Sequence, residues 1–223
     1  MKCFFVTGTD TEVGKTFVSR AMLTQLKNRR LKTAAYKPVA SGCELTEQGL
    51  RNEDALTLQA ASTFNIEYAL VNPYAFAQPI APHLAAAQTG VNIELARLAD
   101  TQQQLQALQP DVLLVEGAGG WRLPLGQGQF MSDYVKQQKM PVILVVGMRL
   151  GCLNHALLTA EAIRHDGLEL AGWVANQVET NMPLLEENQA FLQAHLDAPL
   201  LGCIPRLSDT EMASQYLDLT PII

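Results

Sequence analysis

Short apolar runs alternate with helix-like stretches along the 223 residues of this chain, and this alternation constrains the fold most strongly. Several runs, such as 112–115 and 142–146, lack the polar alternation of half-exposed strands and are typical of strands covered on both faces. The pattern predicts an α/β fold, a mainly parallel sheet with helices on both faces and right-handed crossovers. The expected strands are 3–7, 33–36, 112–115, 142–146, 170–175 and 200–204, and the expected helices are 16–29, 53–62, 93–108, 131–138, 154–166 and 183–195.

A glycine-bearing loop, GTDTEVGKT at 8–16, lies between the first expected strand and the first expected helix. The helix start offers free N–H groups and a partial positive charge to a phosphate, and Gly14 lets the backbone approach closely. Lys15 can reach the β- and γ-phosphates, and Thr16 can hold Mg²⁺. Five residues separate the two glycines, where the usual P-loop has four, and Glu12 needs a metal or a cationic substrate to balance its charge. We therefore expect a three-layer fold of the P-loop NTPase type.

Composition limits the classes of function. Apolar residues make up 48% and charged residues 17%, and the net charge is −6 without a basic patch, so we expect one cytoplasmic domain, 1–223, without a nucleic-acid partner. No apolar run is long enough for a membrane span, and we expect neither a membrane partner nor a secretory signal. The scattered cysteines indicate reduced thiols and the histidines lack metal-ligand spacing; they are Cys3, Cys43, Cys152, Cys203, His83, His155, His165 and His195.

Polar residues follow several expected strands, at the edge where parallel sheets bind ligands. Lys37 is either a solvated surface lysine or a cation that faces a γ-phosphate or an anionic intermediate, and Ser41 is either a turn residue or a hydrogen-bond donor to substrate. Asp54 sits in a first helical turn, where it either favours the helix dipole or completes a magnesium shell. Glu116 ends a buried strand in the Walker-B position, which favours a magnesium ligand, and the glycines at 117–120 permit close backbone approach.

Two further segments carry weaker signals. Asn176 and Gln177 follow the expected strand 170–175; an amide there can pair with an adenine edge, or it can form an ordinary turn. Residues 71–89 contain three prolines and are expected to form a long irregular loop, of a length that is often functional.

Together these motifs resemble the dethiobiotin synthetase family. The resemblance runs in order through residues 8–177, and a further segment extends it almost to the end of the chain. The segments that carry it are GTDTEVGKT at 8–16, YKPVASG at 36–42, RNEDAL at 51–56, NPYAFAQPIAPH at 72–83, VEGAGG at 115–120, PVILVVGMRLGCLNH at 141–155, GWVANQ at 172–177 and APLLGCIPRL at 198–207.

The resemblance implies an ATP- and Mg²⁺-dependent cyclo-ligase. The family closes the ureido ring of dethiobiotin from 7,8-diaminononanoate and CO₂, through a carbamate and a carbamic-phosphoric anhydride, and releases ADP and phosphate. The implied catalytic residues are Lys37, Lys15 and Thr11, and the implied metal shell is Thr16, Asp54 and Glu116. The implied substrate contacts are Ser41, Thr11, Gly151, Cys152, Leu153 and Asn154. The implied nucleotide contacts are Glu12, Val13, Gly14, Lys15, Thr16, Phe17, Asp54, Glu116, Gly117, Ala118, Gly119, Asn176, Gln177, Pro205, Arg206, Leu207 and Glu211.

The family also implies a homodimer that binds the carboxylate tail of the substrate across the subunit interface. The anion would meet the N–H groups of a helix that begins after residues 151–154. Two positions depart from the family: Ala81 stands where relatives often have a serine, and Asn188 is the nearest equivalent of a helix position where relatives have a tyrosine that meets the tail. Both departures concern tail and substrate binding rather than phosphoryl chemistry, and they leave a paralogue with altered substrate as an alternative.

Two other classes of protein share parts of this pattern. An amidoligase-like P-loop enzyme related to cobyrinate diamide synthase would need a glutamine-hydrolysing domain, for which the chain is too short. A partitioning or switch ATPase that dimerises on ATP would carry an extra lysine early in the phosphate loop, where this chain has Thr9, Asp10 and Thr11.

Overall fold

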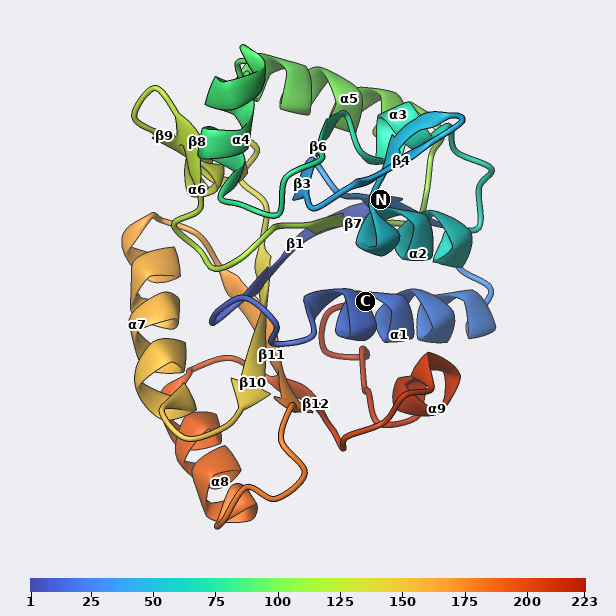
Figure 1. Cartoon of the computed structure of the whole chain (residues 1–223). Coiled ribbons are helices and arrows are strands. Elements are labelled where there is room, and N and C mark those ends of the chain that lie inside the picture. Colours follow the sequence, from blue (N-terminus) through green and yellow to red (C-terminus); the bar gives the residue numbers. More distant parts are fainter.

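A six-stranded parallel sheet runs through the computed structural model, which describes residues 1–223 (Figure 1). The strand order is β12-β11-β10-β1-β7-β2, and every neighbouring pair is parallel. The six predicted strands are confirmed, with ends that agree to within two residues. Their bounds are β1 Lys2–Gly8, β2 Thr33–Tyr36, β7 Val112–Glu116, β10 Val142–Met148, β11 Leu170–Gln177 and β12 Leu200–Ile204.

Helices cover both faces of this sheet, as the predicted α/β class requires. Figure 1 shows α1 and α9 on one side of the strands and α7 and α8 on the other. Each side has its own apolar core: one contains Met22 and Leu23 of α1, and the other contains Leu98 of α5, Ile163 of α7 and Trp173. The helix bounds are α1 Lys15–Asn28, α2 Glu53–Ala61, α3 Tyr68–Val71, α4 Pro82–Thr89, α5 Leu95–Ala107, α6 Met131–Gln137, α7 Cys152–His165, α8 Leu185–His195 and α9 Thr210–Ser214.

The prediction of an irregular loop at 71–89 is wrong. The segment contains a strand, β6 Tyr74–Phe76, which pairs in parallel with β3 Val39–Ser41, and the helix α4. A partner strand more than thirty residues away is invisible to local pattern reading. Pro82 begins α4 instead of breaking it, because the first turn of a helix needs no N–H from that residue.

Two predicted boundaries at the expected ligand-binding edge also change. Asn176 and Gln177 lie inside β11 rather than after it, because both continue the pairing with β10. The helix α7 begins at Cys152, two residues before the predicted start, with Gly151 at its N-cap in a left-handed conformation, φ 93°. Two small antiparallel hairpins were not predicted, and their strands are β4 Glu44–Thr46, β5 Gly49–Arg51, β8 Pro124–Gly126 and β9 Gln129–Phe130.

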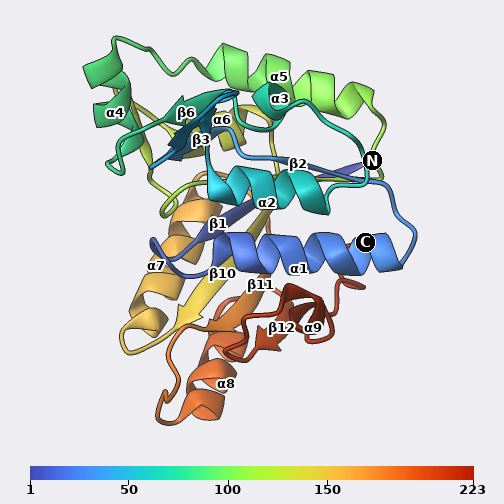
Figure 2. The same ribbon diagram turned by 45° about the vertical axis from the view of Figure 1, so that its right-hand side comes forward.

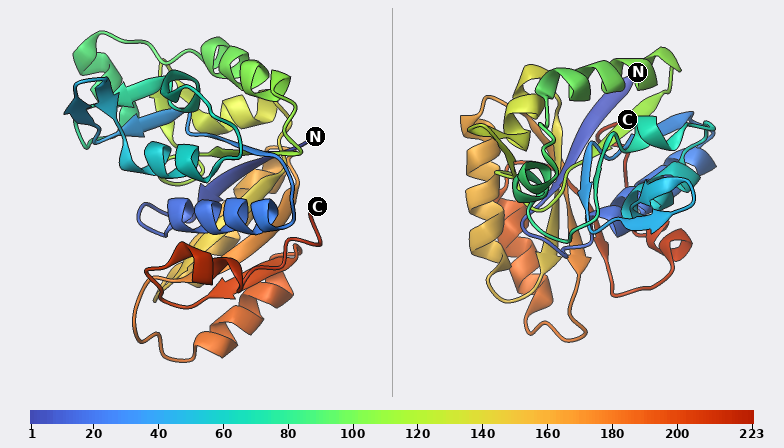
Figure 3. Two further views of the ribbon diagram at one scale, coloured as in Figure 1. Left: turned by 90° about the vertical axis from the view of Figure 1, so that its right-hand side faces the viewer. Right: turned by 45° about the horizontal axis from the view of Figure 1, so that its top comes forward.

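The two termini lie near each other at the end of the sheet where β1 starts, as the left view of Figure 3 shows. The ammonium of Lys2 donates a hydrogen bond of 2.8 Å to the carbonyl of Ile222. None of the helices combines the length and the apolar character that crossing a membrane would require. The carboxyl ends of the strands lie at the opposite edge, where the loop between β1 and α1 turns.

Candidate active site

The phosphate loop joins the end of β1 to the start of α1 (Figure 2). Gly14 caps α1 in a left-handed conformation, φ 84°, and no side chain occupies the cap, so the first N–H groups of the helix remain free for an anion. The buried amide of Asn176 donates to the carbonyl of Val13 at 2.9 Å, which anchors the loop to β11. A Cβ on Gly14 would lie 2.2 Å from the Asn176 Nδ2, so only glycine fits here.

Lys15 is buried beneath the loop, where its ammonium donates to the carbonyl of Asp10 at 3.2 Å. Burial and the nearby ammonium of Lys37 together lower the pKa of Lys15 to about 8, against the opposite effect of neighbouring acids. The side chain of Asp10 accepts from the backbone N–H of Thr11 and from Arg149, each at 2.7 Å. Arg149 follows β10, so a second strand end holds the loop in shape.

Lys37 and Glu116 form a buried ion pair beside the phosphate loop. The Lys37 Nζ donates to Glu116 Oε1 at 2.8 Å and lies 3.6 Å from Asp54 Oδ2, while the Thr16 hydroxyl donates to the same Glu116 oxygen at 2.7 Å. Burial alone would lower the pKa of Lys37, but the two carboxylates outweigh it and hold that pKa above its usual value. Lys37 is therefore a permanent cation, and the interpretation of it as a solvated surface lysine is wrong, because only 3% of it is exposed.

This cluster suits a hard divalent cation. Glu116 Oε2 is buried and has no hydrogen-bond partner, so one carboxylate oxygen is left over in a place where an unpaired acceptor is costly. Glu116, Asp54 and the Thr16 hydroxyl offer only oxygen, the donor that Mg²⁺ prefers. No three His, Cys, Asp or Glu side chains gather into a metal cluster. A magnesium ion here would therefore need phosphate oxygens or water to complete its shell.

A cavity of about 820 Å³ opens onto this cluster. It brings together most of the residues predicted for phosphate, metal and substrate, which come from the phosphate loop, the ends of β2, β3 and β7, and the start of α2. The Ser41 hydroxyl is buried near the cavity wall without a partner, so it is free to bond a ligand. The predicted residues that line the cavity are Thr11, Glu12, Gly14, Lys15, Thr16, Phe17, Lys37, Ser41, Asp54, Ala118 and Gly119.

Other predicted site residues lie outside this cavity. Arg206 follows β12 and donates to the carbonyl of Val178 at 2.6 Å, which ties together the two segments expected near the base. The predicted residues that do not line the cavity are Val13, Glu116, Gly117, Gly151, Cys152, Leu153, Asn154, Asn176, Gln177, Pro205, Arg206, Leu207 and Glu211. Of these, Val13 and Asn176 hold the phosphate loop, and Glu116 lies beneath the cavity wall.

Residue-by-residue reading missed some of the cavity wall. Asn52, which caps α2, and the chain at 79–82 both line the cavity. The wall at 79–82 comes from the segment that was expected to be an irregular loop, for which both its length and its match to the family had pointed to a functional role. The remaining lining residues that were not predicted are Ala40 and Leu123.

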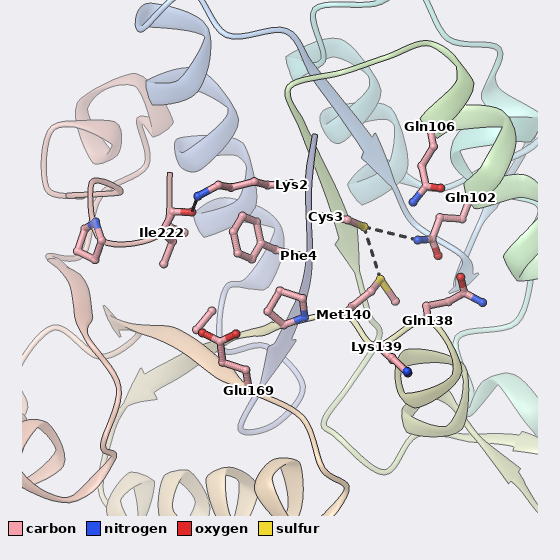
Figure 4. A pocket seen from close by; sticks show the side chains of 13 residues that line it. Lys2, Cys3, Phe4, Gln102, Gln106, Gln138, Lys139, Met140, Glu169 and Ile222 are labelled. Atoms are coloured by element: carbon pink, nitrogen blue, oxygen red, sulfur yellow. Dashed lines mark hydrogen bonds between the residues drawn. The ribbon is translucent and has the colours of Figure 1, made fainter.

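A second hollow, of about 490 Å³, lies at the amino ends of β1 and β10 (Figure 4). Some of its polar groups bond each other: the Gln102 amide donates to the Cys3 thiol and the thiol contacts the Met140 sulfur, both at 3.6 Å. Burial raises the pKa of Cys3 to about 12, so the thiol stays protonated and unreactive at neutral pH. With no buried polar atom left unpaired there, the catalytic chemistry is expected at the other edge of the sheet.

The fold and this site together define a P-loop nucleotide-binding protein: a strand, a glycine-bearing loop, a lysine at a helix start and a buried acid that ends the neighbouring strand. A family model described as an AAA domain matches residues 2–214. Over its full length the chain is 53% identical to the ATP-dependent dethiobiotin synthetase of Cellvibrio japonicus and 54% identical to that of Pseudomonas aeruginosa, each covered over 98% of its length. The Aeromonas hydrophila enzyme is 48% identical over its whole length.

This chain belongs to the dethiobiotin synthetase family, as its motifs predicted. The family consists of ATP-dependent ligases of biotin biosynthesis that form a C–N bond. Among solved structures, the septum site-determining protein MinD with Mg-ADP from Pyrococcus horikoshii has a TM-score of 0.58 and 16% identity, with 95% of this chain and 86% of that one covered. The MinC:MinD cell division complex of Aquifex aeolicus has a TM-score of 0.60, 15% identity and coverage of 96% and 86%. At this identity the likeness describes the fold alone.

Proposed function

We propose that the chain joins CO₂ to the two amines of 7,8-diaminononanoate and closes the ureido ring of dethiobiotin, with ATP converted to ADP and phosphate. The observation that carries this proposal is the buried Lys37–Glu116 pair at the wall of the cavity beside the phosphate loop. A fixed cation there neutralises negative charge on a transferring phosphoryl group and on a carbamate. The family assignment supplies the identity of the diamine.

The chemistry divides into three steps that balance without a covalent enzyme intermediate. One substrate amine takes up CO₂ and loses a proton, which gives a carbamate. A carbamate oxygen attacks the γ-phosphorus of ATP and ADP leaves, which gives the carbamic-phosphoric anhydride. The second amine then attacks the carbonyl carbon and loses a proton, and phosphate leaves with the carbamate oxygen. Each step depends on holding two reactants together, so catalysis is mainly positioning and electrostatics.

Individual residues have roles that fit their places. Lys15 binds the β- and γ-phosphates. The Lys37 ammonium, which bonds Glu116 in the structure, also donates to the carbamate and phosphoryl oxygens and balances their negative charge. Thr11 and Ser41 contact the substrate nitrogens or the carbamate, since both line the cavity. Glu12 is exposed at the mouth of the loop, where its carboxylate can balance a substrate ammonium group.

Magnesium would be held by Thr16, Asp54 and Glu116 together with phosphate oxygens. The ion supplies Lewis-acid stabilisation of the transferring phosphoryl group when it is bound. The Thr16 hydroxyl bonds Glu116, and the Asp54 carboxylate lies 3.6 Å from the Lys37 ammonium that also bonds Glu116, which supports a shared shell for the ion.

The adenine base would be bound at the ends of β11 and β12. Gln177 ends β11, and the segment 205–207 follows β12, so both reach the same edge as the phosphate loop. Asn176 keeps its carbonyl oxygen for the base, because its Nδ2 is committed to Val13. Glu211 lies exposed on α9 and would approach from the rim.

The substrate tail would be bound across a homodimer interface at the start of α7. Gly151 leaves that helix start without a side-chain cap, so its N–H groups are free, and the neighbouring Leu150 is 96% exposed. Ala81 contributes no hydroxyl to the cavity, and the Asn188 amide donates back to the carbonyl of Leu184 at the N-cap of α8. All four cysteines are free thiols, which suits a reducing compartment such as the cytoplasm.

The test is a turnover assay with ATP, Mg²⁺, bicarbonate and 7,8-diaminononanoate, in which mass spectrometry follows the product and phosphate is measured in parallel. We expect dethiobiotin and phosphate in equal amounts. Lys37→Met should abolish ring closure and keep ATP binding, whereas Lys27→Met, an exposed lysine of α1, should leave both unchanged. Phosphate release without a cyclic urea in the unaltered protein would contradict the proposal.

A further inference from the structure

Residues 37, 41 and 54 of the proposed site come from three separate segments, and nothing within a single segment fixes their spacing. Lys37 follows β2, Ser41 ends β3 and Asp54 lies in the first turn of α2. The Lys37 ammonium and the Asp54 carboxylate must nevertheless keep a separation close to their 3.6 Å for both to face one phosphoryl group.

We propose that Asn52, Tyr68 and Asn72 form a hydrogen-bonded positioning network that holds these three segments in register. The proposal rests on the proposed function, because it assigns a purpose to the spacing of residues that the proposed reaction uses. Asn52 and Asn72 are buried and Tyr68 is half-buried.

The backbone of Lys37 is fixed by the last residue of α3 and the residue that follows it. Its N–H donates to the carbonyl of Val71 at 2.8 Å, and its carbonyl accepts from the Asn72 amide at 2.7 Å. The same amide also reaches the carbonyl of Tyr74 at 3.3 Å, at the start of β6. Asn72 therefore determines where the chain leaves β2 and where the Lys37 side chain starts.

Asn52 fixes the other two segments. Its side-chain oxygen accepts from the N–H of Ala55 at 3.1 Å and caps α2, which sets the position of Asp54. Its side-chain amide donates to the carbonyl of Ser41 at 3.4 Å, and its backbone N–H donates to the hydroxyl of Tyr68 at 2.7 Å. One asparagine thus bonds both α2, which carries Asp54, and β3, which ends at Ser41.

The Tyr68 hydroxyl joins the two asparagines. It accepts from the backbone of Asn52 and donates to Asn72 Oδ1 at 3.0 Å. Burial raises the pKa of Tyr68, so the hydroxyl stays protonated and keeps its donor role at neutral pH. The Arg51 guanidinium lies 4.2 Å from the ring centroid and helps to keep the ring in place. Tyr68 does not line the cavity, so it acts on the reaction only through its neighbours.

The chain contains a matched control for Tyr68. Tyr74 is also a tyrosine whose hydroxyl accepts a backbone N–H, from Glu94 at 3.0 Å, and whose ring lies 4.6 Å from an arginine, Arg97. Its hydroxyl bonds the segment before α5 and none of the proposed catalytic segments. Tyr68→Phe and Tyr74→Phe therefore both remove a hydroxyl that accepts a backbone N–H from a tyrosine beside an arginine, but only the first interrupts the network.

The experiment measures steady-state ring closure by both variants as a function of ATP and of Mg²⁺, together with their urea unfolding midpoints. We expect Tyr68→Phe to lower kcat about tenfold and to raise the Mg²⁺ concentration for half-activation about threefold, with the KM for ATP within about twofold of the unaltered protein, because small misplacements of reacting groups cost this much. Tyr74→Phe should keep all three kinetic values within about twofold, whatever its unfolding midpoint.

Equal kinetics for the two variants, in a protein whose unaltered form makes dethiobiotin, would overturn the network and leave the proposed function intact. Absence of dethiobiotin from the unaltered protein would instead overturn the proposed function. Should Tyr68→Phe fail to fold, Asn72→Asp tests the same claim, because it keeps the acceptor for Tyr68 and removes the donor to the Lys37 carbonyl. That variant should show the same loss of kcat and the same shift in Mg²⁺ dependence, and unchanged values would refute the network.

Discussion

Replacing Lys37 and Glu116 separately and together measures the electrostatic pairing on which the site depends. Their charged atoms lie 2.8 Å apart, and at most a few per cent of either side chain is exposed. With an effective dielectric constant of about 20, two unit charges at this distance attract by about 6 kcal/mol. Each charge also loses its hydration on burial, so the pair has a large coupling between its members and a small net contribution to stability.

The two single variants are expected to differ in cost. Lys37→Met leaves the Glu116 carboxylate buried with the Thr16 hydroxyl as its remaining donor, and we expect a loss of about 3–5 kcal/mol in the free energy of unfolding. Glu116→Gln leaves Lys37 with Asp54 at 3.6 Å as a second partner, so the expected loss is about 2–3 kcal/mol. The double variant has no unpaired buried charge in the pair, and its loss should fall below the sum by at least about 2 kcal/mol.

The assay is urea unfolding followed by far-UV circular dichroism at pH 7.5, with the four proteins forming a double-mutant cycle. Equal m-values across the set show that the denatured states are comparable. Losses that add within about 0.5 kcal/mol would refute the reasoning, because independent sites behave in this way. Additivity would mean that the two charges are screened from each other despite their burial.

Three further perturbations test other parts of the site. Gly14→Ala should lower the free energy of unfolding by about 2–4 kcal/mol, since the new Cβ would lie 2.2 Å from Asn176 Nδ2. Gly90→Ala, at φ 68° with nothing within 4 Å of the new Cβ, should cost only about 1 kcal/mol, and equal losses for the two variants in thermal unfolding would contradict the steric argument. The affinity for a fluorescent ATP analogue should fall about tenfold per pH unit above pH 8, because Lys15 has a pKa lowered to about 8 and binds phosphate only when protonated. An affinity that stays constant up to pH 9 would disprove this role. Burial alone would raise the pKa of Asp166, but hydrogen bonds from Arg122 and Trp121 outweigh it and lower that pKa, so the contribution of Asp166 to stability is present above its unfolded pKa of 3.8 and is lost as pH falls through the folded pKa. Asp166→Asn should therefore cost about 1–2 kcal/mol of the free energy of unfolding at pH 7 and should reduce the loss of stability below pH 4, which unfolding measured across acidic pH would reveal.

Elements with a local signal could be predicted from the sequence. The strands β1 and β10 are continuous apolar runs, and the start of α1 carries the glycine and lysine of a phosphate loop, so their places follow from neighbouring residues alone. The burial of Lys37 could not be predicted in this way. Its local sequence is compatible with a surface turn, and only the arrival of Glu116 from β7 makes a buried ammonium stable.

The cavity wall shows the same limit. The pairing of β6 with β3 joins segments more than thirty residues apart, so three prolines at 73, 79 and 82 suggested irregular structure where the chain forms a strand and a helix. The network around Tyr68 was likewise hidden, because a tyrosine at the start of a four-residue helix has no local pattern that distinguishes it from an ordinary packing residue. The roles of these residues depend on hydrogen bonds to segments that are distant in the sequence.

Transfer of ¹⁸O from CO₂ to phosphate tests the central claim most directly. The unaltered protein is mixed with ATP, Mg²⁺, 7,8-diaminononanoate and freshly dissolved C¹⁸O₂, and the phosphate is analysed by mass spectrometry before the label exchanges with water. The proposed mechanism predicts one ¹⁸O atom per phosphate released, because the carbamate oxygen that attacks the γ-phosphorus leaves with it. Phosphate without label, formed together with dethiobiotin, would show that ATP is cleaved by water and would contradict the carbamic-phosphoric anhydride.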